Sequence, residues 1–479
     1  MNKFDKIKYT FSLCFFCVCF SQAQINSDIK RTHHWYFGDK AGLDFTSGNP
    51  TIDLNSQMYE RETGSVISDT SGNLLFYTSG DTVWNKNHQI MPNGTGLINC
   101  FSASQGGIIV KKPNSSTLYY IFTNDCNENA GVSGVHYSVV DMSLNGGFGD
   151  VTTKNVLLFA PSSERLAAVY HCNEKDIWIM GQVRNSNSFC AYLISENGVS
   201  SVPVISSIGF LHNDNVCQCV GQLKFSPNGR KMAAVYATVP GIEELFDFDN
   251  NTGLLSNFIS LPADTSEYGV SFSPDNTKLY IEASYFATKI FQYDLSSGIP
   301  SLIIASRSII LYMPPFTTNG IFGLELAPNG KIYGSNWMLD SLDVINNPNA
   351  LGPACNYVHS AIGLQGRLCR ENLPQFIESY FNPVINPANC ITSIHNIDFE
   401  NKLSIYPNPV NTTLNIQSNE KIICAEIYDI LGVQCKPEMF ITNNIYTIDM
   451  TNEPNGIYYI KLKINLTNTL NKTIIINHD

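Results

Sequence analysis

The chain is built of short runs in which apolar and polar residues alternate, and one phrase of this kind occurs three times. Each copy is an apolar run, a turn of the type Ser-Pro-Asn-Gly or a close variant, and a second apolar run, in 221–236, 269–283 and 323–336. Proline presets φ for the first turn position, and asparagine or glycine accepts the positive φ that follows. Each phrase therefore predicts a β-hairpin.

The repeat extends beyond this hairpin. After each copy come a third alternating run, a Gly- or Asn-rich turn and a short closing run, within 244–257, 289–301 and 341–352. One unit therefore comprises four predicted strands. Three upstream segments fit the same template more loosely, namely 64–91, 106–151 and 165–201. Six such units at this spacing are typical of a β-propeller.

One piece remains at each end of the repeats. Segment 33–54 offers outer strands without an inner hairpin partner, and segment 371–382 offers an inner strand with nothing after it. Joined, they would complete a seventh blade. Closure is favoured because an open ring leaves one face of each terminal blade in water. The sequence thus predicts an all-β protein, with a seven-bladed, WD40-like propeller over 24–382 closed by its N- and C-terminal strands.

The N-terminal segment 1–23 has the pattern of a secretory signal peptide. Three lysines precede an apolar run over about 9–20, and Ser21-Gln22-Ala23 then supplies small residues at the positions that a signal peptidase reads. The apolar run is shorter than the roughly 20 residues that a membrane-spanning helix needs. We therefore expect cleavage after Ala23 and export of the protein.

The C-terminal part differs from the repeats in its composition and in its pattern of strands. A Pro- and Asn-rich linker over 383–402 is followed by short strands separated by turns over 403–479, which predicts a small Ig-like β-sandwich. Its segments "IYPNP", "IYDILG" and "GIYYIKL" form a specific set. The positions that carry the pattern are Tyr406, Pro407, Asn408, Pro409, Gly432, Gly456, Tyr458 and Lys461.

This set resembles the C-terminal sorting domain of the type IX (Por) secretion system. The resemblance implies that the type IX machinery is a partner, and that the protein passes the outer membrane to the cell surface or the medium. Segments of 33–380 such as "WYFGDKAGLDF" and "LFDFDNNTG" are similar to propeller regions of surface proteins from Bacteroidota. That second resemblance implies fold and lineage, and it implies no particular activity.

Export changes the interpretation of the cysteines. Eleven of the fourteen remain after cleavage, an odd number that cannot all pair within one chain. A pair between Cys355 and Cys369 would close a loop, although spacing alone does not fix connectivity. Cys217 and Cys219 lie near His212, but a second pair of ligands at zinc spacing is missing. We expect buried or disulfide-bonded cysteines there and predict no metal site.

The net charge and the sequence motifs exclude several classes of function. The net charge of −12 disfavours binding to a phosphate backbone, so we set nucleic acid aside. No P-loop, Rossmann glycine run, H-E-x-x-H or G-x-S-x-G pattern occurs in a suitable context, and no cofactor is predicted. Segment 247–253, "DFDNNTG", begins like a calcium loop but lacks the glutamate at the twelfth position, which favours a hairpin.

Two classes of function remain. In the first, the propeller binds a glycan, peptide or protein at the cell surface through its loops or its axial channel, with Trp84 and Trp337 as candidate stacking platforms. In the second, it is an exported hydrolase or lyase in which Glu282 and Glu325 meet as general acid and base. The predominantly apolar inner strands and the lack of a catalytic signature favour binding, and we assign no catalytic residue.

Overall fold

The computed structural model divides the chain into two compact units, Met1–Cys390 and Ile391–Asp479. The residues that the structure describes are 24–25, 27–62, 64–212, 219–284, 287–315, 320–382, 384–385, 403–418, 422, 424–429, 434–435, 439–442, 445–463 and 469–478. The expected signal peptide over 1–23 lies outside them, as does the expected linker except for 384–385. Among the described residues, no helix combines the length and the hydropathy that crossing a bilayer requires.

Unit 1 is a propeller-like all-β unit made of small antiparallel sheets whose strands pair in chain order. Its N-terminal sheets are β2–β3–β4 (His34–Phe37, Ala41–Asp44, Thr51–Ile52), β5–β6–β7–β8 (Ser65–Ser68, Leu74–Thr78, Thr82–Asn85, Ile90–Thr95), β9–β10–β11–β12 (Gly107–Lys111, Leu118–Thr123, Val135–Asp141, Asp150–Phe159) and β13–β14–β15–β16 (Ser162–Tyr170, Ile177–Val183, Ser188–Ser195, Gly198–Val199), with β17 (Val204–Ser207) pairing with β15.

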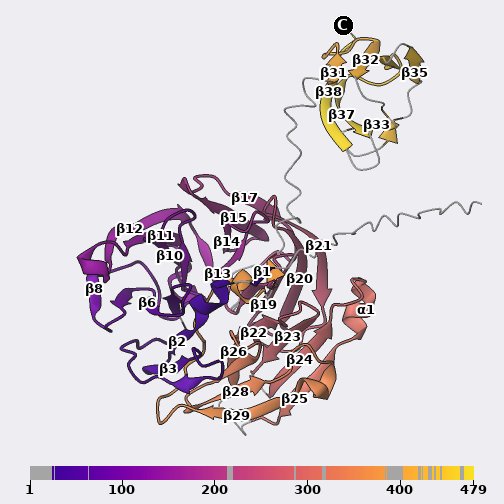
Figure 1. Cartoon of the computed structure of the whole chain (residues 1–479). Coiled ribbons are helices and arrows are strands. Elements are labelled where there is room, and N and C mark those ends of the chain that lie inside the picture. The colour runs from indigo at the N-terminus through magenta and orange to yellow at the C-terminus, as the bar shows by residue number, and fades with distance from the viewer. Residues whose placement is uncertain are drawn as a thin grey trace, which may run out of the picture. The chain divides into compact units, whose positions relative to one another are not determined.

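The remaining sheets of unit 1 contain the three repeated hairpins. They are β18–β19–β20–β21 (Leu223–Phe225, Lys231–Tyr236, Ile242–Asp249, Leu254–Leu261), β22–β23–β24–β25 (Glu267–Phe272, Lys278–Ala283, Thr288–Asp294, Ser308–Met313) and β26–β27–β28–β29 (Ile321–Leu326, Ile332–Asn336, Ser341–Ile345, Tyr357–Gly363). Figure 1 shows these sheets following one another around a common centre, with the first strand of each, such as β13, β22 and β26, nearest to it. The apolar core lies between adjacent sheets.

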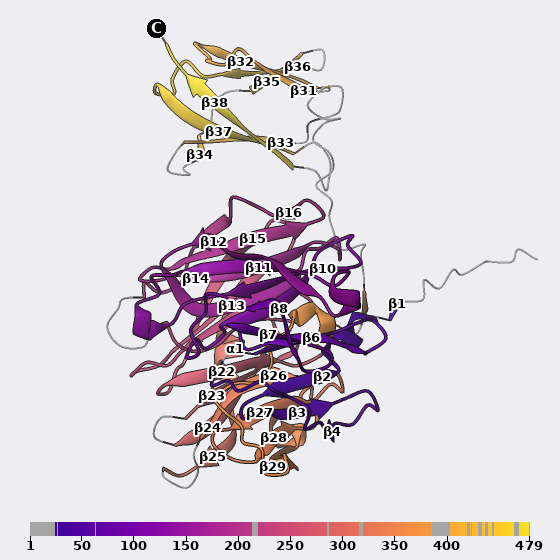
Figure 2. The ribbon, with the colours of Figure 1, turned by 90° about the vertical axis from the view of Figure 1, so that its left-hand side faces the viewer.

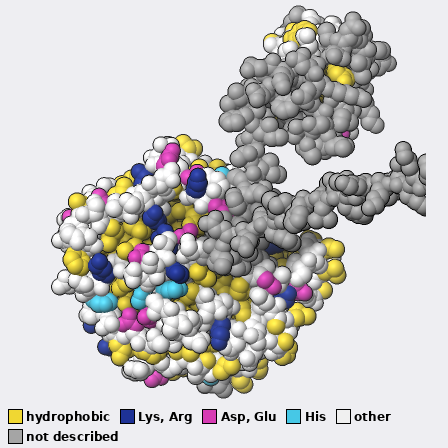
Figure 3. All heavy atoms as spheres, viewed as in Figure 1, with side chains coloured by type: hydrophobic (Ala, Val, Ile, Leu, Met, Phe, Trp, Pro, Cys, Tyr) yellow, Lys and Arg dark blue, Asp and Glu magenta, His cyan; other side chains and the backbone are white. Residues whose placement is uncertain are grey.

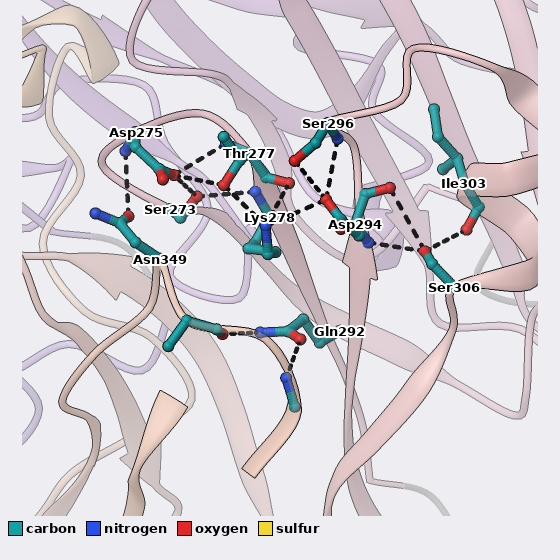
Figure 4. Close-up of polar contacts among 12 residues, drawn as sticks. Ser273, Asp275, Thr277, Lys278, Gln292, Asp294, Ser296, Ile303, Ser306 and Asn349 are labelled. Atoms are coloured by element: carbon teal, nitrogen blue, oxygen red, sulfur yellow. Dashed lines mark hydrogen bonds and ion pairs between the residues drawn. The ribbon is translucent and has the colours of Figure 1, made fainter. Parts of the chain in front are cut away.

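The predicted hairpins are confirmed, and their turns are held by side chains of the turn itself. In the turn between β22 and β23, Ser273 Oγ donates to Asp275 Oδ1 at 2.7 Å and accepts from the Lys278 amide at 2.9 Å. Lys278 Nζ then pairs with Asp294 on β24 at 3.1 Å (Figure 4). In the first copy, Gly229 has φ 66°, and a Cβ there would lie 3.0 Å from Val169 Cγ2 of β13. Glycine therefore suits that turn, which has a positive φ and packs closely on the neighbouring sheet.

The closing strands depart from the prediction in two repeats. In the second, Pro300 begins helix α1 (Pro300–Ala305), and the fourth strand β25 comes only after it. Proline is favoured at the first helical turn because its missing N–H is not needed there. In the third, the 3₁₀-helix η4 (Gly352–Cys355) precedes β29. The segment 247–253 forms the end of β20 and the turn that leads to β21, as predicted for a hairpin.

The two ends of unit 1 meet, but not as one regular sheet. Segment 371–382 adds no strand to β2–β3–β4; it forms single parallel bridges, Gln375 with Ser65 and Ile377 with Ala168, and then the 3₁₀-helix η5 (Glu378–Phe381). Its side chains are buried among the inner strands, where Asn372 donates to the Ser104 carbonyl and Ser379 Oγ accepts from the Tyr170 amide. Beyond it, β30 (Val384–Ile385) pairs with β1 (Gln24–Ile25), next to the 3₁₀-helix η1 (Ser27–Thr32).

The cysteines pair differently from the expectation. Cys100 and Cys126 form a disulfide, and Cys172 is also disulfide-bonded. Cys355 and Cys369 are both buried and carry free thiols, so the loop closure considered for them is wrong. Cys217 lies outside the described residues. Asp125 is close to the Cys100–Cys126 sulfurs, but a disulfide leaves no thiolate to hold a metal ion.

Unit 2 is a sandwich of two four-stranded sheets, which face each other in Figure 2. One is β31–β32–β36–β35 (Leu403–Tyr406, Thr413–Ser418, Ile445–Asp449, Met439–Thr442), and the other is β34–β33–β37–β38 (Gln434–Cys435, Cys424–Asp429, Gly456–Lys463, Thr469–Ile476). Apolar residues of both sheets alternate with exposed ones and form the core, which includes Leu414, Ile448 and Ile460.

The cysteine assignment is directly testable by alkylation and mass spectrometry of the mature protein. We expect a linked Cys100–Cys126 peptide pair without reduction. We expect Cys355 and Cys369 to resist alkylation in the native state, because they are buried, and to react after unfolding without any reductant. A Cys355–Cys369 linked peptide would contradict the assignment. The double variant Cys100→Ala/Cys126→Ala should lose roughly 3–4 kcal/mol of stability, as expected for a loop of this length.

Candidate functional site

A buried ion triad lies where the inner strands of unit 1 converge. Lys224 of β18 places its ammonium 2.5 Å from Glu325 Oε2 of β26 and 2.8 Å from Glu378 Oε1 of η5. All three side chains are almost fully buried. Burial by itself lowers the pKa of Lys224, but the two carboxylates raise it above its usual value. Burial also raises the pKa of Glu378 and that of Glu325, the latter to about 8.

Amide side chains join the same segment to the other inner strands. Gln222 Nε2 donates to Asn372 Oδ1 at 2.7 Å, and the Asn372 amide donates in turn to the Ser104 carbonyl. Gln222 Oε1 accepts from the backbone N–H of Val270 at 2.9 Å. A Cβ at Gly323 would lie 2.0 Å from Asn372 Oδ1, so only glycine admits this contact. These side chains fill the space between the inner strands. The two ends of the inner strands are therefore the places that remain for a ligand.

Four carboxylates gather where the inner strands begin. Ser102 Oγ lies 3.2 Å from Glu62 Oε1 and 2.8 Å from Glu128 Oε1, and Tyr268 donates to Glu62 Oε2 at 2.8 Å. Glu371 approaches Glu62 from the C-terminal segment. Burial raises the pKa of Glu62 well above its usual value, and the Glu371 carboxyl raises it further, by its charge and by a hydrogen bond between the two groups. Carboxyl groups share such a bond only when one carries a proton.

The fourth carboxylate, Glu164 of β13, is held by hydrogen bonds. Its oxygens accept from the Ser104 hydroxyl at 2.8 Å and from the Asn127 amide at 2.5 Å. Burial raises the pKa of Glu164 to about 7, although these donors act in the opposite direction. Glu60 is similar: burial raises its pKa to about 8 while the Gly38 amide donates to it. Neutral pH therefore lies within the titration range of this cluster.

Exposed aromatic and cationic side chains lie next to the carboxylates. Arg61 is 46% exposed and pairs with Glu371 at 3.1 Å and with Glu62 at 3.6 Å. Next to it, Arg370 pairs with Asp39 at 2.7 Å, donates to Tyr59 Oη at 3.1 Å and contacts Met338. We call this the Arg61 surface, and its exposed members are Arg61, Tyr59 (65% exposed), Phe101 (68%), Trp337 (37%) and Met338 (38%).

The two tryptophans that the sequence suggested as stacking platforms, Trp84 and Trp337, have different surroundings in the structure. Trp337 belongs to the Arg61 surface, and a line of ring contacts leads from it to the carboxylates: Trp337 to Phe322 at 6.1 Å, and Phe322 to Tyr268 at 5.5 Å between centroids. Trp84 lies on β7, stacked on Tyr77 at 5.3 Å, and packs against the apolar core. It is partly buried, and its contacts are those of a core residue.

Glu282 and Glu325, which the sequence suggested as the acid and base of a hydrolase, bind different side chains. Glu325 belongs to the ion triad. Glu282 is buried on β23, where its oxygens accept from Ser284 Oγ and from the Gly269 amide. Burial raises the pKa of Glu282 well above its usual value. The structure therefore gives each of the two a local structural role and does not present them together to a substrate.

The predicted sorting residues are divided between the two sheets of the sandwich. Residues 406–409 are exposed at the end of β31, and Asn408 Oδ1 accepts from the Ile475 amide of β38 at 2.8 Å. Gly456 begins β37, Tyr458 is buried and donates to the Pro454 carbonyl at 2.9 Å, and Lys461 lies further along the same strand. Gly432 lies outside the described residues.

Residues 404–477 match the family model of the secretion system C-terminal sorting domain, Por_Secre_tail. The protein is exported across the outer membrane. The domain is typical of Bacteroidota and places the protein on the type IX route, to the cell surface or the medium. No curated protein matches the chain in sequence.

Solved structures show a distant likeness. A calcium-binding protein, regucalcin from Agrobacterium tumefaciens, is 14% identical over 53% of this chain and 73% of its own, with a TM-score of 0.33. A 6-phosphogluconolactonase-like protein from Bacteroides uniformis is 14% identical over 81% and 96%, with a TM-score of 0.38. Its counterpart from Bacteroides fragilis is 12% identical over 76% and 89%, with a TM-score of 0.39. All three TM-scores lie below 0.5, so the chemistry of this chain does not follow from them.

Sequence reasoning missed most of the Arg61 surface. Tyr59, Arg61 and Phe101 stand in connections just before inner strands, and Arg370 follows the last repeat, so no local pattern joins them. One signal was present: "QLKFS" and "LELA" each carry one charged residue, Lys224 and Glu325, in strands that otherwise have the composition of a core. Opposite charges at equivalent positions of different repeats indicate an ion pair at the axis.

The ion triad predicts a pH-dependent cost for losing its cation. Lys224→Met leaves two carboxyls buried without a partner. Their pKa values in the folded state then exceed those in the unfolded state still further, and stability falls as pH rises between the two values. We expect a loss of about 3–5 kcal/mol at pH 8 and a clearly smaller loss at pH 5, measured by urea unfolding.

The matched control is Glu325→Gln, which keeps the cation and one carboxylate. It should be close to the unsubstituted protein at pH 5 and at least as stable at pH 8, because one buried titration is removed. An equal loss for Lys224→Met at both pH values would mean that burial of the three groups, and not their charge, determines the effect.

Proposed function

We propose that unit 1 is a seven-bladed β-propeller in which β2–β3–β4 forms the blade that joins the two ends. Three contacts support this. Trp35 of β2 packs on Tyr333 of β27 at 5.5 Å between ring centroids and on Phe376 of the C-terminal segment at 6.1 Å. On its other side, β2 lies next to β5. The three-stranded sheet thus stands between the last and the first of the four-stranded sheets, and β1–β30 fastens the ends.

The function that the site supports best is binding of a glycan at the cell surface through the Arg61 surface. The observation that carries this proposal is that three exposed aromatic side chains, Tyr59, Phe101 and Trp337, come from segments joined to the carboxylate cluster or to Arg370 beside it. Exposed apolar patches of this kind, rimmed by polar groups, mark interaction sites. Tyrosine, tryptophan and arginine are also the residues that dominate the energy of interfaces.

The chemistry of the surface suits a sugar. A pyranose ring presents a C–H face, which packs on an aromatic ring, and an edge of hydroxyl groups, which need hydrogen-bond partners. Here Tyr59 and Trp337 offer ring faces, while the Arg61 guanidinium and the exposed Glu128 carboxylate offer donors and acceptors beside them. A peptide that uses the same rings is the other outcome of the binding test.

The hydrolase alternative gains no support from the geometry. Glycoside hydrolases hold their two carboxyl groups about 5–5.5 Å or 6.5–9.5 Å apart, so that a sugar or a water molecule fits between them. Glu62 and Glu371 are hydrogen-bonded to each other, and both pair with Arg61, at 3.6 and 3.1 Å, so their partners are protein groups. Glu282 and Glu325 are buried with separate partners. The carboxylates of the axis therefore act as structural groups beneath a binding surface.

The binding proposal predicts loss of affinity on removing the rings. Tyr59→Ala/Trp337→Ala should weaken binding of the mature protein to its best ligand on a glycan array by about tenfold or more, because each ring contributes on the order of 1 kcal/mol. Tyr312→Ala, an equally exposed aromatic on β25, should bind normally. Unchanged affinity of the double variant, or an array without any bound glycan, would refute the proposal.

The sorting assignment predicts a defect in location. Deletion of 403–479 should leave the protein in the periplasm and remove it from the cell surface and the medium, as measured by fractionation and surface proteolysis in a Bacteroidota host. Trp337→Ala should be exported normally, since it alters unit 1 alone. Surface exposure of the truncated chain would show that another part of the protein directs export.

A further inference from the structure

A pocket of about 180 Å³ lies at the opposite end of the inner strands from the Arg61 surface. It forms where the ends of unit 1 meet, between η1, the end of β9, the end of β13 and η5. Among its lining residues are Arg31, Lys111, Lys112, Lys175, Asp28 and Tyr170. In β13, Glu164 belongs to the carboxylate cluster and Tyr170 to this pocket. At about 3.3 Å per residue, the two sites are about 20 Å apart.

The pocket carries an excess of positive charge. Of the residues that the structure describes, four cations and one carboxylate line it, whereas the chain as a whole has 29 basic and 41 acidic residues. Figure 3 draws the side from which β1 is seen in Figure 1, and several Lys and Arg side chains lie on that face. Four cations in one small pocket of an acidic protein repel one another, and such an arrangement attracts an anion.

The single carboxylate is already engaged. Asp28 Oδ1 pairs with Arg31 at 2.6 Å, and its Oδ2 accepts from the Tyr170 hydroxyl at 2.7 Å. Among the described residues, no carboxylate lies within ion-pair distance of Lys111, Lys112 or Lys175. Partial burial lowers the pKa of Lys111, and the charge of Arg31 lowers it further, while the charge of Asp28 acts in the opposite direction. Asp28 thus offsets only part of the positive charge that lines the pocket.

We propose that this pocket binds a phosphate or sulfate group, with Arg31, Lys111, Lys112 and Lys175 as its cationic ligands. The guanidinium of Arg31 is fixed by Asp28 and buried, so it is oriented before the anion arrives. The lysines act as point charges on flexible stems around it. The volume equals that of about six water molecules in the liquid, which admits a five-atom oxyanion and the first atoms of whatever carries it.

Such binding is coupled to the closure of unit 1. Arg31 belongs to η1, near the N-terminal end of the unit, and Tyr380, another lining residue, belongs to η5 at its C-terminal end. Lys111 and Lys175 belong to the sheets between which these ends are seated. An anion held by all of them stabilises the folded state by mass action, since the unfolded chain has no such site.

The test is thermal unfolding of the mature protein with sodium phosphate, sodium sulfate or methyl phosphate, against sodium chloride at the same ionic strength. We expect an oxyanion to raise the Tm by about 2 °C or more at ten times its midpoint concentration. A lower midpoint for methyl phosphate than for phosphate identifies a group attached to a larger molecule, and the reverse identifies the free anion. A Tm that rises no more with any oxyanion than with chloride overturns the proposal.

Two double variants separate the pocket from general charge. Lys111→Gln/Lys175→Gln should lose most of the oxyanion-dependent rise. Lys86→Gln/Lys154→Gln removes the same charge from exposed positions elsewhere and should keep the rise. Without oxyanion, the pocket variant should unfold at the same temperature as the unsubstituted protein or higher, because repulsion is relieved. An undiminished rise in the pocket variant, or a lower Tm without oxyanion, would show that the lysines have a structural role instead.

Discussion

One buried ammonium group connects parts of unit 1 that are far apart in the sequence. Lys224 on β18 is neutralised by Glu325 on β26 and by Glu378 on η5. Ion pairs of one cation therefore join the inner strands of two sheets to the C-terminal segment. A buried ion pair adds little net stability when it is intact, but removing one partner is costly. The triad therefore acts chiefly on specificity, because an arrangement without the C-terminal segment in the axis takes from Lys224 one of its two carboxylate partners.

The filled axis determines where the protein meets other molecules. Because Asn372, Gln222 and the triad occupy the space between the inner strands, ligands are confined to the two ends of these strands. The ends differ in chemistry. One has aromatic rings and guanidinium groups over carboxylates with raised pKa values, and the other has lysines around one engaged aspartate. The proposed glycan and oxyanion sites thus lie about 20 Å apart.

The sequence predicted what depends on neighbouring residues and missed what depends on distant ones. Turns such as 226–229 follow from local preferences for φ, and the signature of the sorting domain is contiguous. The path of 371–382 is different: its pattern of apolar residues suits an inner strand, and only contacts with Ser65, Ala168 and Lys224 take it through the axis. Cys355 and Cys369 were close in sequence, yet burial and not a disulfide accounts for them. Trp84 and Trp337 look alike in sequence and differ in exposure.

The central claim is that the C-terminal segment of unit 1 is an interior element. Native-state hydrogen exchange of the mature protein tests it most directly, since the amides of Glu371 and Gln375 donate to the carbonyls of Arg61 and Gly64 inside the molecule. The account predicts that amides of 371–381 exchange as slowly as those of the inner strands β18 and β22, through global unfolding. Exchange of that segment as fast as exposed turns, while β18 and β22 stay protected, would contradict it.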